Sequence, residues 1–366
     1  MLRSHRASRL VRALPSTRRA AHDLTVLPSK PVISYGPAGR SAVSGHVATV
    51  FGATGFLGRY LIAKLAKGGT QVIVPFREED EARHLRVTGD LGQIVPLEWD
   101  LRNEEQIREC VRHSDIVYNL VGRDYETKNF DYQSVHVKGA ELIAQICAES
   151  PSVSRFVHVS HLNASVDSPS AFYRTKALGE EKVKKAFPNA TIVRPGPMYG
   201  HEDKLLNNMA IWPILWKLNH GETQISPVHV FDVAQALAIL QASAPLPKTL
   251  SLPGPTSYTY ESIMNLIQNL TYNAPSRAPT VPKPVALLLA RAAQLVWWPT
   301  LSPDEVERRY LSDVKVPGDW ESLGIVPDEL EHVAINYVRR YRSAANFAKP
   351  VEPRPHKAAG SYHVTE

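Results

Sequence analysis

The fold of this chain is decided by the stretch Val50-Phe51-Gly52-Ala53-Thr54-Gly55-Phe56-Leu57-Gly58, which helix-like residues 59–67 follow at once. Gly52 allows a sharp reversal at a strand end, Gly55 removes a Cβ where a pyrophosphate must approach, and Gly58 lets the helix pack closely on its strand. The N–H groups of the first helical turn then face the phosphates. A tight turn without a ligand is the simpler alternative. The context favours a dinucleotide site formed by Gly52, Thr54, Gly55, Phe56 and Leu57.

Strands and helices alternate on both sides of this turn. Apolar runs predict strands over residues 46–51, 71–74, 94–99, 114–118, 155–159 and 190–193. Helical periodicity is strongest over residues 59–67, 103–110 and 136–148. This spacing is typical of an α/β protein with a doubly wound parallel sheet. We therefore expect a Rossmann-type domain over residues 46–200 and a smaller, interleaved C-terminal α/β domain over residues 201–345.

The second predicted strand is followed by Pro75-Phe76-Arg77, at the position where a dinucleotide fold recognises the adenosine ribose. An acidic residue there binds the ribose hydroxyls of NAD, whereas Arg77 can pair with the 2′-phosphate of NADP. The acids Glu78, Glu79 and Asp80 complicate this choice, and we interpret them as the start of the next helix, where they suit its dipole. The sequence therefore favours NADP(H) over NAD(H).

The spacing Gly-x-x-Gly-x-x-Gly resembles the short-chain dehydrogenase/reductase superfamily, particularly its extended and atypical branches. The resemblance implies a hydroxyl residue after the fifth strand and a tyrosine four residues before a lysine. In that arrangement the tyrosine is the acid/base, and the lysine lowers its pKa and holds the nicotinamide ribose. Here the fifth strand ends Val159-Ser160-His161, and the family register places His161 at the hydroxyl position. Ser160 can serve only if the register slips.

The catalytic pair of the superfamily is incomplete in this chain. Lys176 is present, but the residue four positions before it is Phe172, which can neither give nor take a proton. Tyr173 is three residues before the lysine and points about 100° away on a helix. A one-residue irregularity in the helix would rescue Tyr173. We expect nucleotide binding without ordinary tyrosine–lysine catalysis.

Other strand ends carry further candidate contacts with the cofactor. Asp100-Leu101 resembles the superfamily's strand-end aspartate beside the adenine, and an N-cap for the helix over residues 103–110 is the alternative role of Asp100. Small residues after the fourth strand allow a close approach of the phosphates and ribose. The turn after the sixth strand resembles the extended branch's turn beside the nicotinamide. These two strand ends add Val121, Gly122 and Pro195 to the predicted site.

A narrower resemblance is to the NADPH-binding accessory subunits of mitochondrial respiratory complex I, over about residues 46–270. Its most specific segments are Val159–Asn163 and Gly200–Asn207. The resemblance implies a matrix-side subunit of the peripheral arm, near its junction with the membrane arm. Such a subunit binds NADPH tightly, supports assembly or stability, and stays outside the main electron path. The alternative from another class is an active NADP-dependent reductase, epimerase or isomerase that uses Tyr173 or another proton donor.

The charge of the chain is concentrated at its start. The formal net charge is +6, and residues 1–20 contain six arginines, no lysine and no acid, which leaves residues 21–366 formally neutral. An arginine-rich, acid-free leader is typical of a mitochondrial presequence, which we place at residues 1–25. A disordered basic tail is the alternative. The neutral remainder gives little support to an RNA-binding or other nucleic-acid-binding role.

The rest of the sequence excludes some classes and informs less about others. Cys110 and Cys147 predict no disulfide or metal framework. No apolar run reaches the ~18 residues of a membrane span, since Arg291 and Gln294 interrupt the longest one. Paired tryptophans in the distal part leave contact with a partner or a membrane surface open. These tryptophans are Trp212, Trp216, Trp297 and Trp298. We expect extended segments over residues 26–45 and 346–366.

Overall fold

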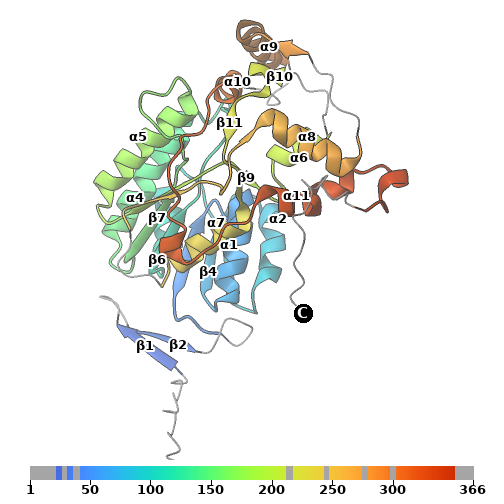
Figure 1. Ribbon diagram of the computed structural model, residues 1–366. Coiled ribbons are helices and arrows are strands. Elements are labelled where there is room, and N and C mark those ends of the chain that lie inside the picture. The colour runs from blue at the N-terminus through green and yellow to red at the C-terminus, as the bar shows by residue number, and fades with distance from the viewer. Residues whose placement is uncertain are drawn as a thin grey trace, which may run out of the picture.

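The computed structural model describes residues 22–26, 31–35, 42–211, 217–242, 247–273, 279–296 and 302–350. Its centre is a seven-stranded parallel sheet with the strand order β13-β8-β7-β6-β3-β4-β5 (Figure 1). The chain starts in the middle of this sheet, builds outward to β5, and returns to build outward to β13. The sheet strands are β3 (Val47–Phe51), β4 (Gln71–Phe76), β5 (Ile94–Glu98), β6 (Ile116–Asn119), β7 (Arg155–Val159), β8 (Thr191–Pro195) and β13 (Thr249–Leu252).

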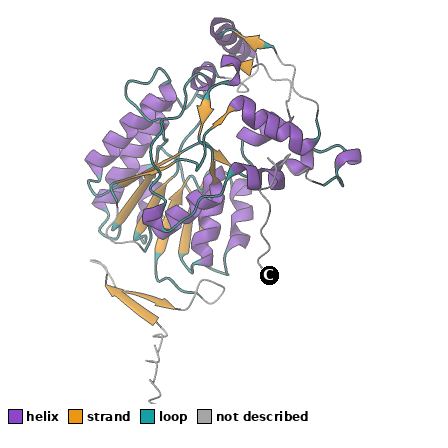
Figure 2. Cartoon of the chain, in the orientation of Figure 1, coloured by secondary structure: helices purple, strands orange, loops and turns teal. Residues whose placement is uncertain are grey.

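Helices cover both faces of the sheet (Figure 2), which confirms the predicted doubly wound α/β fold. One face packs against α1 (Phe56–Lys67) and α7 (Val230–Ile239). The other face packs against three helices, which are α3 (Glu104–Val111), α4 (Ala140–Glu149) and α5 (Ala171–Ala186). Because neighbouring strand residues point to opposite faces, Val50 and Phe51 of β3 enter the two different cores.

One predicted helix differs from its expected form, and another is confirmed. The predicted helix over residues 136–148 begins as a π-helix, η2 (Gln133–Gly139), and continues as the α-helix α4. The acids after Arg77 open α2 (Glu79–Arg83), as predicted, and a 3₁₀ turn, η1 (His84–Thr88), follows. The free cysteines Cys110 and Cys147 are buried in α3 and α4.

The distal part is assembled from short strand pairs and helices. Its main core joins α6 (Leu205–Ile211), α8 (Tyr260–Thr271) and α11 (Leu330–Val338), and a smaller core joins α9 (Lys283–Val296) to α10 (Pro303–Arg309). Both α7 and β13 lie inside the stretch 201–345 that the sequence assigns to this part, yet they pack with the nucleotide sheet. The short strands are β9 (Met198–Tyr199), β10 (Lys217–Leu218), β11 (Gln224–Ile225), β12 (Val228–His229), β14 (Tyr258–Thr259) and β15 (Thr280–Val281).

Several predictions fall on residues outside the part of the chain that the structure describes. An antiparallel pair of strands, β1 (His22–Val26) and β2 (Pro31–Tyr35), spans the junction of the predicted presequence and lead-in. Residues 1–21, residues 351–366 of the predicted tail, and Trp212, Trp216, Trp297 and Trp298 lie outside the described residues. In the described part of the chain, no helix combines the length and apolar character that crossing a bilayer requires.

Candidate functional site

The glycine turn between β3 and α1 has the geometry that the sequence predicts. Gly52 has a φ of +80°, and a Cβ there would lie 2.9 Å from the carbonyl carbon of Leu120. A Cβ on Gly58 would lie 2.4 Å from the carbonyl oxygen of Ala53, so only glycine lets α1 pack this closely. At Gly55, in contrast, a Cβ would meet only the oxygen of Gly52, at 3.2 Å, and its other side is open.

The N-terminus of α1 is available to an anion. Its N-cap, Gly55, offers no side chain, and the first turn contains no acidic residue. The first backbone N–H groups of a helix lack partners within the helix and carry a partial positive charge. An open cradle in front of an uncapped helix fits a pyrophosphate group.

One cation beside this turn was missed by the sequence reasoning. The Nε of Arg59 donates a hydrogen bond to the backbone oxygen of Thr54 at 3.2 Å, and its guanidinium lies 3.7 Å from Glu202. The hydroxyl of Thr54 donates to Glu81 at 3.3 Å. An arginine in the first turn opposes the helix dipole, and this unfavourable placement was the available signal for a role at the turn.

The two adenosine-side candidates are exposed and have different surroundings. Arg77 directly follows β4, and among the described residues none makes a hydrogen bond or ion pair with it. The alternative role of Asp100, as the N-cap of α3, is wrong, because Asn103 caps α3 by accepting from the N–H groups of Glu105 and Gln106. The carboxylate of Asp100 instead accepts from the N–H of Arg102 at 2.8 Å. Its neighbour Leu101 packs against Gly139, where a Cβ would lie 2.8 Å away.

Lys176 lies at the carboxyl ends of β6 and β7. Its side chain is buried, and its Nζ donates to the backbone oxygen of Val159 at 3.3 Å. A Cβ on Gly122 would lie 3.1 Å from this Nζ, so the loop of Val121 and Gly122 and the lysine form one corner of the site. Burial lowers the pKa of Lys176 to about 8.

A buried histidine supports this corner. The N–H of Arg123 donates to Nε2 of His136 at 3.1 Å, so the ring proton is on Nδ1, which lies 3.0 Å from the hydroxyl of Thr175. That hydroxyl in turn donates to the backbone oxygen of Ala171 at 2.9 Å. Burial holds the pKa of His136 well below its ordinary value. This neutral chain of hydrogen bonds joins the β6 loop to α5, which carries Lys176.

The segment after β7 presents unused polar atoms. The hydroxyl of Ser160 is buried and has no hydrogen-bond partner in the described part of the chain. His161 accepts at Nδ1 from the N–H of Asn163 at 3.1 Å, which places its proton on Nε2, and burial lowers its pKa to about 3. The backbone oxygen of Pro195, at the end of β8, accepts from the N–H of Leu162 at 2.9 Å and ties this segment to the neighbouring strand.

The catalytic pair is arranged as the residue spacing indicates. The helix α5 is continuous over residues 171–186, with Ser170 as its N-cap, so no irregularity turns Tyr173 toward the lysine. The Phe172 ring centre lies 5.9 Å from Nζ of Lys176. Tyr173 packs against His161, with ring centres 4.8 Å apart, and its hydroxyl contacts Asn163. The position beside Lys176 is thus occupied by a ring without a hydroxyl.

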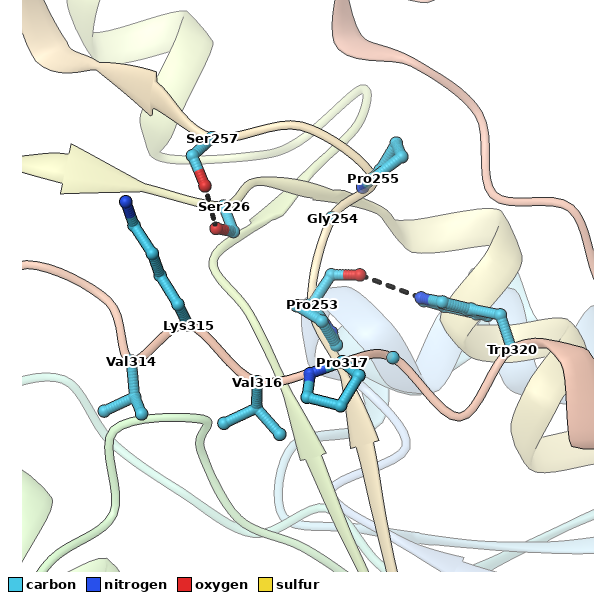
Figure 3. A pocket seen from close by; sticks show the side chains of 11 residues that line it. Ser226, Pro253, Gly254, Pro255, Ser257, Val314, Lys315, Val316, Pro317 and Trp320 are labelled. Carbon is cyan, nitrogen blue, oxygen red and sulfur yellow. Dashed lines mark hydrogen bonds between the residues drawn. The ribbon is translucent and has the colours of Figure 1, made fainter.

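A separate pocket of about 420 Å³ lies past the carboxyl end of β13 (Figure 3). It is bounded by the turn at Pro253 and by the segment that leads to Trp320, whose Nε1 donates to the oxygen of Pro253 at 2.9 Å. The pocket contains none of the predicted cofactor residues.

Comparisons with known proteins agree with this geometry. A family model described as NAD(P)H-binding matches residues 52–211. A solved dTDP-glucose 4,6-dehydratase from Streptomyces venezuelae, with NAD and TYD bound, superposes with a TM-score of 0.64 at 16% identity, covering 84% of this chain and 100% of that chain. The fold and the matched family model therefore define a protein with an NAD(P)H-binding domain of the Rossmann type.

Closer relatives are mitochondrial subunits. The chain is 44% identical to the NADH-ubiquinone oxidoreductase 40 kDa subunit of Neurospora crassa, over 91% of this chain and 89% of that protein. It is 41% identical to the NADH dehydrogenase [ubiquinone] 1 alpha subcomplex subunit 9 of Rattus norvegicus, over 94% and 95% of the two chains. The chain belongs to this family of subunits.

Proposed function

We propose that this protein is an accessory subunit of mitochondrial respiratory complex I that binds NADPH as a structural cofactor. The sequence identity of 44% and 41% to subunits named for this enzyme, over nearly the full length of both chains, supports the assignment. The observation that carries the structural role of the cofactor is the phenylalanine beside Lys176, in a site otherwise equipped to hold a dinucleotide.

The open glycine cradle and the unpartnered Ser160 hydroxyl fit such a cofactor. The glycine turn would hold its phosphates, and Arg77 would pair with a 2′-phosphate. The remaining candidates would line the adenine and nicotinamide halves of the cofactor. They are Asp100, Leu101, Val121, Gly122, Ser160, Lys176 and Pro195.

Among the described residues beside Lys176, none offers the tyrosine acid/base of the superfamily. Phe172 has no ionisable group, and burial raises the pKa of the Tyr173 hydroxyl far above neutrality while its ring packs on His161. Burial also keeps His161 neutral with a pKa of about 3, which suits a hydrogen-bond donor better than a base. The bound nucleotide supplies hydride chemistry in active relatives, but here these residues support binding alone. The active reductase, epimerase or isomerase stays the rival, and turnover by the purified protein would favour it.

The subunit would lie on the matrix side of the inner membrane, at the junction of the peripheral and membrane arms. Contact with a membrane or subunit surface is supported by the outward side of α9, where Val285, Leu288 and Leu289 are 46%, 67% and 41% exposed. The formal neutrality of residues 21–366 gives no support to nucleic acid as a partner. Import would remove the arginine-rich leader, so the mature N-terminus should lie between about residues 20 and 45.

The test is native gel separation of mitochondrial membranes, with identification of the proteins that migrate with this chain and of nucleotide released on denaturation. We expect complex I subunits and NADPH. Migration of the chain as a free protein, or mature protein that begins at Met1, would oppose the proposal.

A further inference from the structure

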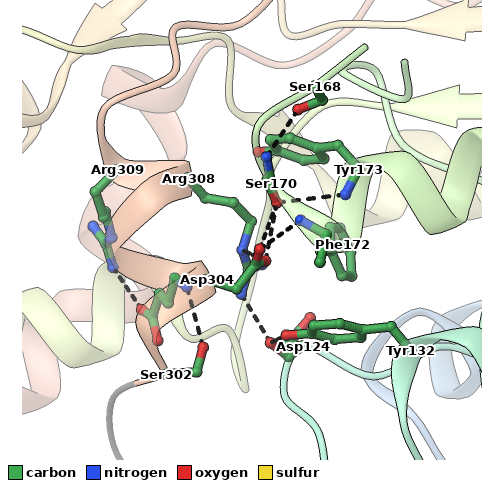
Figure 4. Close-up of polar contacts among 12 residues, drawn as sticks. Asp124, Tyr132, Ser168, Ser170, Phe172, Tyr173, Ser302, Asp304, Arg308 and Arg309 are labelled. Atoms are coloured by element: carbon green, nitrogen blue, oxygen red, sulfur yellow. Dashed lines mark hydrogen bonds and ion pairs between the residues drawn. The ribbon is translucent and has the colours of Figure 1, made fainter. Parts of the chain in front are cut away.

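A helix from the distal part lies directly on the corner of the site that Phe172 and the loop after β6 form. The N-cap of α10 is Ser302, whose hydroxyl accepts from the N–H of Glu305 at 3.1 Å. Figure 4 shows this helix facing the start of α5 and the loop after β6. The contacts join residues more than 130 positions apart in the sequence.

The first contact is a cap made by another element. Asp304 of α10 accepts from the hydroxyl of Ser170 at 2.9 Å and from the N–H of Ala171 at 2.7 Å (Figure 4). These two groups start α5, and a carboxylate at a helix N-terminus is stabilising. Because α5 carries Phe172 and Lys176, Asp304 fixes the helix that forms one wall of the site.

The second contact covers Phe172. The guanidinium of Arg308 lies 4.6 Å from the centre of the Phe172 ring, and its Nη2 donates to the backbone oxygen of Asp124 at 2.8 Å. Asp124 follows Gly122 in the β6 loop, so one arginine joins both walls of the site. The Nε of Arg308 lies 3.4 Å from Oδ2 of Asp304, so the two α10 residues that contact the site also pair with each other.

A third contact anchors the segment that follows α10. Asp313 accepts from the side-chain amide of Asn163 at 2.7 Å and from the N–H of Ser226 at 2.8 Å. The oxygen of the same Asn163 side chain accepts from Val314 at 3.0 Å. Because Asn163 holds the ring of His161 through its backbone, the segment 302–314 touches the loops after β6 and β7 and the start of α5.

We propose that α10 is part of the nucleotide site, and that the bound nucleotide and the docked helix stabilise one another through Arg308 and Asp304. This inference rests on the proposed nucleotide binding. A ligand that orders the β6 loop and α5 also favours the state in which α10 is docked on them, and the coupling is reciprocal. The effect extends to α9, because Glu307 pairs with Lys283 at 2.7 Å and Val306 packs on Ala286 and Ala290.

The test is hydrogen exchange of the full mature chain with and without NADPH, together with NADPH affinity measured by titration. NADPH should slow exchange of the amides of residues 302–313 on the order of tenfold, a typical coupling. Arg308→Ala should remove that protection and weaken NADPH binding by a similar factor, since the two effects are linked. Asp304→Asn is a second variant, in case Arg308→Ala folds poorly.

The matched control is Glu307→Gln, which lies on the same helix but faces α9. It should retain both NADPH affinity and the protection of α10. If NADPH binds and leaves exchange of α10 unchanged, the coupling is refuted while nucleotide binding stands. If NADPH does not bind at all, both the coupling and the proposed function are refuted.

Discussion

Gly55→Val separates the nucleotide-binding role of the glycine turn from its folding role. The backbone at Gly55 has φ −72° and ψ 175°, a conformation that any residue adopts. A Cβ there would meet only the oxygen of Gly52, at 3.2 Å, so the valine side chain extends into the open cradle. Losing glycine at an N-cap costs the folded state about 1 kcal/mol, and we expect the variant to fold.

The loss of binding should be much larger than the loss of stability. Each hydrogen bond from a backbone N–H to a charged acceptor contributes about 1.5–3 kcal/mol. A valine that keeps the pyrophosphate from two amides of the first turn of α1 therefore costs about 3–6 kcal/mol, which weakens NADPH binding at least about a hundredfold. In the unmodified protein, NADPH at a hundredfold excess over Kd contributes about 2.7 kcal/mol of stability.

The assay is thermal unfolding with and without NADPH. The unmodified protein should gain a few degrees in Tm, and Gly55→Val should gain none while unfolding at nearly the same temperature without nucleotide. Gly58→Ala is the contrasting variant, because its Cβ would lie 2.4 Å from the oxygen of Ala53 and should lower Tm even without nucleotide. A Gly55→Val protein that keeps the full NADPH-dependent rise would show that the cradle does not hold the phosphates.

Three further predictions use the charged groups of the chain. Arg77→Ala should raise Kd for NADPH about ten- to a hundredfold and spare NADH, and equal affinities of the unmodified protein for both nucleotides would contradict the role of Arg77. Burial lowers the pKa of Lys176 to about 8, so its ammonium loses its charge and NADPH affinity should fall as pH rises through 8. Lys176→Met should abolish that pH dependence, and its persistence would exclude the lysine as the cause. Burial raises the pKa of Asp203 to about 6 from its ordinary 3.8, so the folded state retains a proton that the unfolded state releases. The free energy of unfolding should therefore decrease by about 2 kcal/mol as pH rises from 4 to 6, and Asp203→Asn should flatten this slope in denaturant titrations.

The central sheet could be predicted because its evidence is local. Apolar runs and the glycine turn identify strands such as β3 and β7 without knowledge of their neighbours. Fine details depended on competing local choices. Asp100 and Asn103 are both good capping residues three positions apart, and only the chain path shows that Asn103 is the cap.

The contacts of α10 could not be predicted in the same way. Arg308 and Asp124 are separated by 184 residues, and no local periodicity links them. The apolar residues of α9 can be recognised in the sequence. They do not indicate which surface of the protein the neighbouring helix α10 covers. Arg59 was recognisable in principle, since a cation in the first turn of a helix requires a compensating contact.

Phe172 links the proposed loss of proton chemistry to the docking of the distal part. Two cations approach its ring, with Nζ of Lys176 at 5.9 Å and the guanidinium of Arg308 at 4.6 Å from its centre. Partly desolvated cation–π contacts contribute about 0.5–2 kcal/mol, so the ring stabilises both side chains. The guanidinium of Arg308 covers this ring. We therefore predict that Phe172→Tyr alone does not confer turnover, because Arg308 of α10 would still cover the ring.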